Sequence, residues 1–223
     1  MLGIMIDNEL KMNQHVSIGK KSLINQLNLR LVTLKKLVRV LDFKFSLPLA
    51  NAIFHSKLLY GIEAWGLCPK YLIKKIQTIQ NKAARYVQGY KSRTLDTNTL
   101  LKNMKWLPIQ ELINYRISCL VHQIINTKTP IYLYEMLITN NQTNTRNKVG
   151  NKLGTKPREI GKTMYTKNQF CSRAYDIYNN IPSIITSITK RDMFKKYLKR
   201  YLMDNDDTPD PNIYKIAGLS EGL

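Results

Sequence analysis

Apolar residues recur every three or four positions along most of this chain, which is the spacing that gathers them on one face of an α-helix. Two long stripes stand out, one from about Val16 to Leu41 and one from Tyr71 to Tyr90. Shorter segments with the same spacing lie at 46–60, 94–106, 107–124, 131–137, 170–179 and 190–203. The pattern predicts a mainly α fold of about six to eight helices.

Proline and glycine predict several helix boundaries. Ser46-Leu47-Pro48 is typical of a helix start, because serine can cap the first turn and proline needs no backbone donor there. Pro108 and Pro130 mark two further starts. Gly61 lies inside an apolar pattern and is predicted to weaken or bend that helix. Gly89 is predicted to stop the helix that begins near Tyr71.

Some stretches depart from helical spacing. Leu2–Ile6 is a short apolar run that predicts a strand or half of a hairpin. A segment rich in Asn, Thr, Lys and Gly predicts a flexible basic linker, either a phosphate-gripping arm or an unstructured insertion. The predicted order is an N-terminal strand remnant at 1–14, a helical domain at 15–138, this linker at 139–167, a C-terminal helical pair at 168–203 and an acidic tail at 204–223.

The net charge of the chain indicates which kind of partner it binds. The chain has 35 Lys and Arg against 15 Asp and Glu, a formal net charge of +20. Residues 1–203 hold 34 of these cations and 10 of the acids, a net of +24, and the tail has a net of −4. Such an excess favours a polyphosphate partner, because each phosphate contact releases condensed counterions. A solvated basic surface and an anionic membrane surface stay open as alternatives.

Other features concern the compartment. Charges interrupt every apolar run well short of the ~18 residues of a membrane helix, and MLGIMIDNEL lacks the basic start of a secretory signal. Cys68, Cys119 and Cys171 are odd in number and far apart, which fits a reducing compartment better than a disulfide framework. We therefore expect an intracellular protein of the nucleus or cytoplasm, with no membrane partner.

The sequence offers no residue set for catalysis or for a cofactor. His15, His55 and His122 are scattered without metal-ligand spacing, and Asp206-Asp207 stand in a polar tail. We find no glycine-rich phosphate loop and no paired carboxylates with supporting groups. We therefore predict no catalytic residue, no metal site and no cofactor in this chain.

Candidate nucleic-acid contacts are the cations on helix faces outside the apolar stripes, together with those of one basic loop. For each of them a solvated surface position is the alternative. Trp65, Trp106 and Phe194 are interpreted as core residues rather than as platforms for stacked bases. The candidate contacts are Lys35, Lys36, Arg39, Lys74, Lys75, Lys82, Arg85, Lys91 and Arg93.

Several segments taken together resemble the C-terminal part, the thumb and downstream region, of a non-LTR retrotransposon reverse transcriptase of the jockey and CR1 kind. Five segments in order carry the resemblance: LGIMID at 2–7, LLYGIEAWG at 58–66, IQTIQNKAAR at 76–85, WLPI at 106–109 with Tyr115 and Arg116 after it, and YNNIP at 178–182 followed by FKK at 194–196. Each segment alone is a weak match, and the ordered set spans about residues 1–203.

The resemblance implies a helical, thumb-like bundle that holds an RNA or DNA template-primer hybrid without reading its sequence, preceded by the remnant of a palm-end strand. In that family the catalytic carboxylates lie upstream of the LG segment. Nothing in this chain matches them, so no catalytic role is carried over to any residue. The cysteine-rich knuckle that ends some of these elements is also missing.

Two other functions stay open at this stage. The chain could form part of an active RNA-directed DNA polymerase whose catalytic region lies upstream or in another chain. It could instead be a helical protein-interaction module. Salt separates the second alternative from nucleic-acid binding, because phosphate contacts weaken steeply as salt rises.

Overall fold

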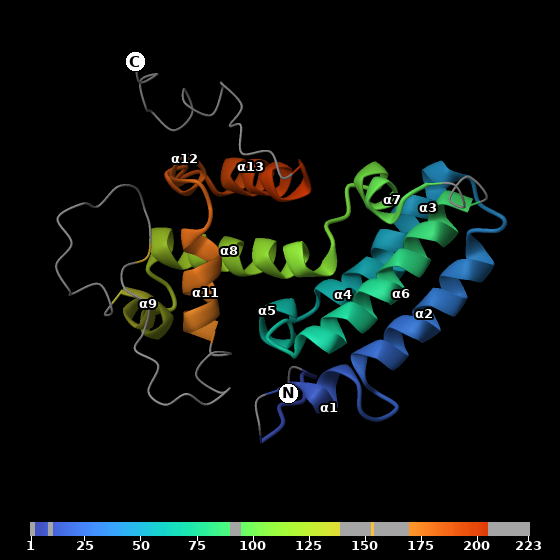
Figure 1. The fold of residues 1–223 in the computed structure, drawn as a ribbon, viewed down its shortest axis with the longest axis horizontal. Helices are drawn as coiled ribbons and strands as arrows, with labels where there is room; N and C mark the ends of the chain where they lie inside the picture. Colours follow the sequence, from blue (N-terminus) through green and yellow to red (C-terminus); the bar gives the residue numbers. More distant parts are fainter. Residues whose placement is uncertain (1–2, 9–10, 90–94, 139–152, 154–169, 205–223) are drawn as a thin grey trace, which may run out of the picture. The chain divides into compact units, whose positions relative to one another are not determined.

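In the computed structural model, residues 3–8, 11–89, 95–138, 153 and 170–204 are described, and they form helices joined by turns (Figure 1). The prediction of a mainly α fold is confirmed. The chain divides into two compact units, residues 1–113 and 114–223. The division falls within one long helix, α8 (Ile109–Thr127).

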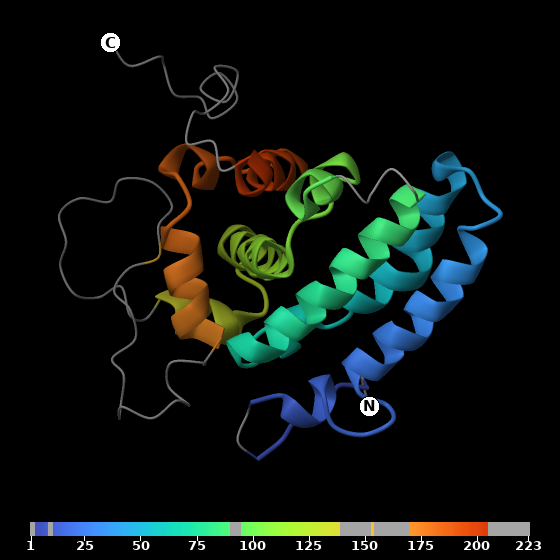
Figure 2. The same ribbon diagram turned by 45° about the vertical axis from the view of Figure 1, so that its right-hand side comes forward.

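The first unit is built around two long helices, α2 (Leu23–Leu37) and α6 (Lys70–Gln88), which pack side by side (Figure 2). The stripe predicted from Tyr71 therefore forms a helix within two residues of its expected ends. The remaining helices of this unit are α1 (Asn13–Val16), α3 (Phe43–Ala50), the π-helical turn η1 (Asn51–His55), α4 (Ser56–Leu59), α5 (Ile62–Trp65) and α7 (Thr97–Asn103).

The core of the first unit consists of the apolar stripes of α2 and α6. Leu27 and Leu34 of α2 and Ile76 of α6 are completely buried, as are Phe54 and Trp65. Burying one such side chain contributes roughly 1.5–3 kcal/mol to stability. The periodic apolar pattern therefore identifies the face of each helix that turns inward.

The stretch predicted as one helix from Val16 to Leu41 contains a break. Gly19 has φ of +88°, a conformation that favours glycine, and Ser22 is extended. The helix α2 therefore begins at Leu23, after the separate turn α1, and it ends at Leu37. Apolar spacing continued across the break because both sides face the same core.

The helix predicted to begin at Ser46-Leu47-Pro48 begins earlier, at Phe43, with Asp42 at the N-cap position. The Ser46 hydroxyl donates to the Leu41 carbonyl at 3.2 Å instead of capping a helix. Pro48 consequently lies inside α3, where it cannot donate to the Lys44 carbonyl. One missing hydrogen bond is tolerated because the helix continues into η1 and α4.

Gly61 separates α4 from α5, as its position in the pattern predicted. Its φ of +62°, next to the extended Tyr60, interrupts the helix between the two segments. The predicted stop at Gly89 and the start before Ile109 are also found. The capping residue of α7 is Asp96, whose carboxylate accepts a hydrogen bond from the backbone N–H of Asn98 at 3.1 Å.

The strand expected in Leu2–Ile6 is not formed in its described part, Gly3–Ile6. A lone strand has no partner for its backbone hydrogen bonds, and the described residues provide no second strand beside it. Asp7 instead anchors the segment to α1. Its carboxylate oxygens accept hydrogen bonds from the backbone N–H groups of Lys11 and Asn13, both at 2.7 Å.

The second unit contains the larger part of α8, then α9 (Ile131–Ile138), α11 (Phe170–Asn179), α12 (Ser183–Thr186) and α13 (Arg191–Asp204). Phe194 and Tyr178 are completely buried, and the His122 ring stacks on Phe194 with centroids 3.9 Å apart. The four-residue α12 was not predicted. Almost all of the predicted linker at 139–167 and acidic tail at 204–223 lies outside the described residues.

Candidate nucleic-acid interface

One face of α6 carries five cations and no acid. Lys74, Lys82 and Arg85 lie on this face, and all three are exposed. The buried residues of α6 occupy the opposite side of the helix, because a helix turns about 100° per residue. From Lys74 to Arg85 the face extends over about 16 Å of helix. Among the described candidate contacts, this is the longest row of cations on one helix.

The end of α2 adds a cation to the same face. The Lys35 ammonium lies 5.6 Å from the centre of the Tyr86 ring, in the last turns of α2 and α6. A cation over an aromatic face is weakly attracted to it. The contact places Lys35 beside α6 at Tyr86, one turn after Lys82 along the helix. Like α6, α2 contains no Asp or Glu.

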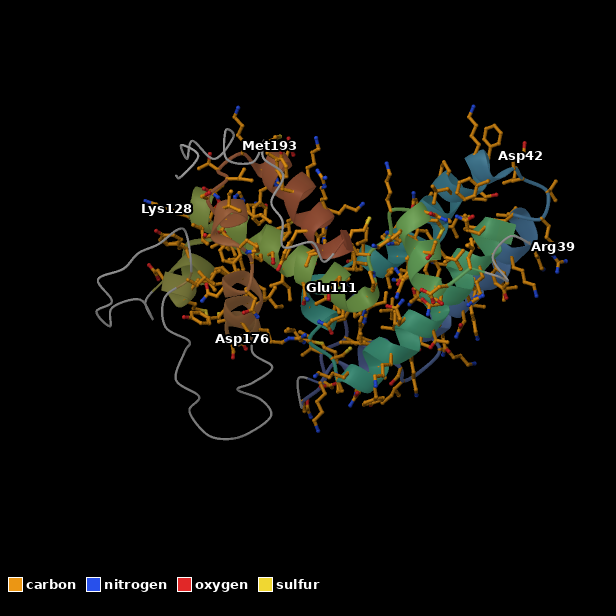
Figure 3. The ribbon with its side chains drawn as sticks, turned by 45° about the horizontal axis from the view of Figure 1, so that its top comes forward. Arg39, Asp42, Glu111, Lys128, Asp176 and Met193 are labelled. Carbon is orange, nitrogen blue, oxygen red and sulfur yellow. The ribbon has the colours of Figure 1, made fainter. Side chains whose placement is uncertain are left out.

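Lys70 and Lys75 complete the five cations of the α6 face, and the Lys75 ammonium lies 5.8 Å from the centre of the Tyr71 ring. The remaining candidate residues lie outside α6. Lys36 and Arg39 are exposed at the end of α2 and in the turn after it, where Figure 3 labels Arg39. Lys91 and Arg93 lie outside the described residues. Arg85 also reaches the Thr97 hydroxyl of α7, at 3.5 Å.

A group of side-chain amides holds the inner side of α6 in place. Gln80 is completely buried and donates to the Leu107 carbonyl at 3.0 Å. The Gln77 carbonyl oxygen accepts the backbone N–H of Ile109 at 2.7 Å. Gln77 also donates to Gln80 at 2.9 Å and to Asn81 at 2.7 Å. We call Gln77, Gln80 and Asn81 the amide cluster.

The amide cluster joins two of the segments that carry the resemblance, IQTIQNKAAR and WLPI. Sequence reasoning did not assign it a role. A signal was available, because Gln80 occupies a position in the apolar stripe between Ile76 and Ala83. A polar residue in such a stripe needs a hydrogen-bond partner inside the protein.

The two tryptophans and Phe194 are core residues, as interpreted from the sequence. Trp65 and Phe194 are completely buried and Trp106 nearly so. The Trp106 indole N–H donates to the Asn51 amide oxygen at 2.8 Å, and its ring stacks on His55 with centroids 5.0 Å apart. These rings are therefore unavailable to stack on nucleic-acid bases.

Among the residues that the structure describes, the pKa shifts of the titratable groups do not point to an activated nucleophile. Burial raises the pKa of the Cys119 thiol and of Cys171, which disfavours the reactive thiolate. Burial also raises the pKa of Tyr115 to about 12, and the neighbouring Cys119 adds to this shift. Within the part of the chain that the structure describes, no three His, Cys, Asp or Glu side chains gather where they could share a metal ion.

The chain was compared with known proteins, and its described helices were compared with the requirements of a membrane span. Comparisons with protein families, with characterised proteins and with solved structures give no match. Among the described helices, none combines the length and the apolar character that crossing a bilayer requires.

Proposed function

We propose that this chain binds nucleic acid through the cations of α6 and of the end of α2, without reading base sequence. The observation that carries the proposal is the α6 face, with five cations, no acid, and its apolar stripe on the opposite side. A row of positive charge along a rigid helix suits a regularly spaced phosphate backbone.

The residue types support recognition of the backbone rather than of the bases. Lysine binds phosphate as a point charge, with three donors that rotate freely. Sequence readout would instead need paired hydrogen bonds to base edges, as arginine, asparagine and glutamine make. Two of the three glutamines of α6, Gln77 and Gln80, are engaged inside the protein.

The ligand class that we propose is an RNA–DNA hybrid of template-primer type. The resemblance to reverse-transcriptase thumbs supports this choice, and so does the physical chemistry of A-form duplexes. Their deep major groove excludes side chains, so proteins recognise them through shape and backbone. A lysine-rich helix face meets that requirement.

The test measures binding of the full chain to a blunt RNA–DNA hybrid as salt is raised. We expect the logarithm of the binding constant to fall linearly with the logarithm of salt concentration. The triple variant K74Q/K75Q/K82Q should lower that slope by roughly 0.9 for each phosphate that no longer has a lysine beside it. Each substitution removes charge from an exposed side chain, so the fold should be retained.

A matched control removes the same amount of charge elsewhere. Lys128, Lys190 and Lys196 are exposed cations of the second unit. The variant K128Q/K190Q/K196Q should keep the slope of the unchanged protein. Equal slopes for the two triple variants would show that binding depends on net charge alone and not on the α6 face. Binding that is insensitive to salt would favour a protein-interaction module.

A further inference from the structure

The turn that joins α2 to α3 exposes aromatic and aliphatic side chains next to cations. Val40 is 87% exposed, Phe45 57% and Phe43 46%. Lys36, Arg39 and Lys44 are their neighbours in the sequence and are exposed as well. We call residues 38–45 the aromatic turn, and Figure 3 labels Arg39 and Asp42 on it.

The backbone explains why these rings remain in solvent. Phe43 and Phe45 are two positions apart at the start of α3, so they point in different directions from the helix axis. The inward face of α3 is formed by Ser46 and Ala50, both buried. No single core could therefore cover both phenyl rings.

We infer that the aromatic turn binds single-stranded nucleic acid, with Phe43 and Phe45 stacking on unpaired bases while the cations hold the backbone. Proteins that bind single strands without sequence preference combine these two elements, because every base offers a π face to an aromatic ring. This inference rests on the proposed function and extends it to a second kind of nucleic-acid surface.

Continuity with the α6 face supports this ligand over a lipid surface. Lys35 contacts Tyr86 in the last turn of α6, and the aromatic turn begins three residues further along the chain. A strand leaving a duplex held along α6 would meet Phe43 and Phe45 at that end. Insertion into an anionic bilayer would require a continuous apolar face, whereas here Asp42 and Lys44 stand beside the two rings.

The experiment compares the blunt hybrid with the same hybrid carrying a short single-stranded extension, using the full chain. We expect the extension to improve affinity roughly tenfold, as stacking of one base on an aromatic ring would do. The variant F43L/F45L should lose this gain and keep blunt-hybrid binding. The variant F43Y/F45Y retains both rings and should keep the gain.

Leucine preserves the apolar bulk of phenylalanine, so the comparison isolates the aromatic ring. Tyr132→Leu is the matched control, because Tyr132 is an exposed aromatic residue of α9 in the second unit. It should leave the gain unchanged. A gain that survives in F43L/F45L would overturn the inference.

Two outcomes distinguish a failure of this inference from a failure of the proposed function. Blunt-hybrid binding that gains nothing from an extension overturns the aromatic turn alone. Absence of binding to the blunt hybrid at low salt overturns the proposed function and this inference with it. The experiment also measures binding of the chain to phosphatidylserine vesicles. If F43L/F45L still binds the vesicles, and the extension does not improve binding of the hybrid, the turn is assigned to a lipid surface instead.

Discussion

Helices α6 and α13 each carry five cations, but their acids and their packing differ. In α13 the acids Asp192 and Asp204 belong to the same helix, and Asp192 lies one turn before Lys196. Arg191 and Lys195 also lie near enough to Cys119 to act on its pKa. In α6 no carboxylate interrupts the row. Equal numbers of cations therefore produce a continuous positive face in only one of the two helices.

The inner sides of the two helices differ as well. The inner side of α13 includes an aromatic group, in which Phe194 stacks on the His122 ring and lies next to the tilted ring of Tyr178. The α6 core adds the amide cluster to its aliphatic stripe. We therefore expect core substitutions to act on stability in both helices, and charge substitutions to act on binding at α6 but not at α13.

Removal of the central ring of the second unit should have the largest effect. Phe194→Ala is expected to lower the free energy of unfolding by about 3–5 kcal/mol, because it leaves a cavity beneath a stacked histidine. Denaturant titration of the full chain measures this loss. Met193→Ala, at the half-buried neighbouring position, is the control. Similar losses for the two variants would contradict the described packing.

Disruption of the amide cluster should rank second. Gln80→Leu leaves the Leu107 carbonyl without its partner and removes one of the two acceptors of the Gln77 amide, at an expected cost of about 1–3 kcal/mol in the free energy of unfolding. Thr78→Ala changes an exposed residue of the same helix and should stay within about 0.5 kcal/mol of the unchanged protein. If Gln80→Leu were neutral in the same titration, the cluster would not hold α6.

Acidification should weaken the second unit through His122. Burial lowers its pKa, partly offset by the hydrogen bond that its Nε2 donates to the Ile188 carbonyl at 2.6 Å. The unfolded chain then binds a proton more readily than the folded one. Stability is retained above about pH 6.5, the ordinary value, and falls below it by at most ~1.4 kcal/mol per pH unit.

His122→Gln should remove that part of the pH dependence, measured as the difference between unfolding free energies at neutral and acidic pH. His15, whose pKa burial also lowers, contributes with the same sign in the first unit. His15→Gln is therefore the parallel variant. An unchanged pH profile in both variants would assign the acid sensitivity to other groups.

A single added acid should make α6 resemble α13, with the smallest expected effect. Thr78→Glu places a carboxylate one turn from both Lys74 and Lys82, and such pairs favour the helix slightly. Hybrid binding at low salt should weaken roughly fivefold, the equivalent of about 1 kcal/mol. Thr78→Gln is the neutral control. Equal affinities for the two variants would show that continuity of charge is unimportant.

The sequence predicted best what depends on periodicity. The α11 helix has the predicted bounds, and the cations of α6 lie opposite its apolar stripe because helix geometry requires it. The break at Gly19 and the early start of α3 escaped prediction, since apolar spacing runs through both. The strand expected at Leu2–Ile6 failed because pairing requires a partner that local sequence does not supply.

Contacts between distant segments could not be predicted. The pairs Gln80–Leu107 and Asn51–Trp106 depend on how helices pack, and the apolar stripe indicated that Gln80 faces inward without indicating its partner. The sequence also did not predict that Phe43 and Phe45 are exposed, because phenylalanine in an apolar pattern is usually a core residue. Sequence therefore predicted the cationic face, whereas the structure revealed the cluster behind it and the aromatic turn.

The amide cluster affects how this protein responds to changes in salt and pH. Amides carry no net charge and do not titrate, so changes in salt or pH should have little effect on the hydrogen bonds of the amide cluster that hold α6 in place. Added salt can screen the outer lysines without loosening the helix that displays them. A phosphate ligand should thus be released by salt from a frame that keeps its shape, ready to bind again once the ions are diluted.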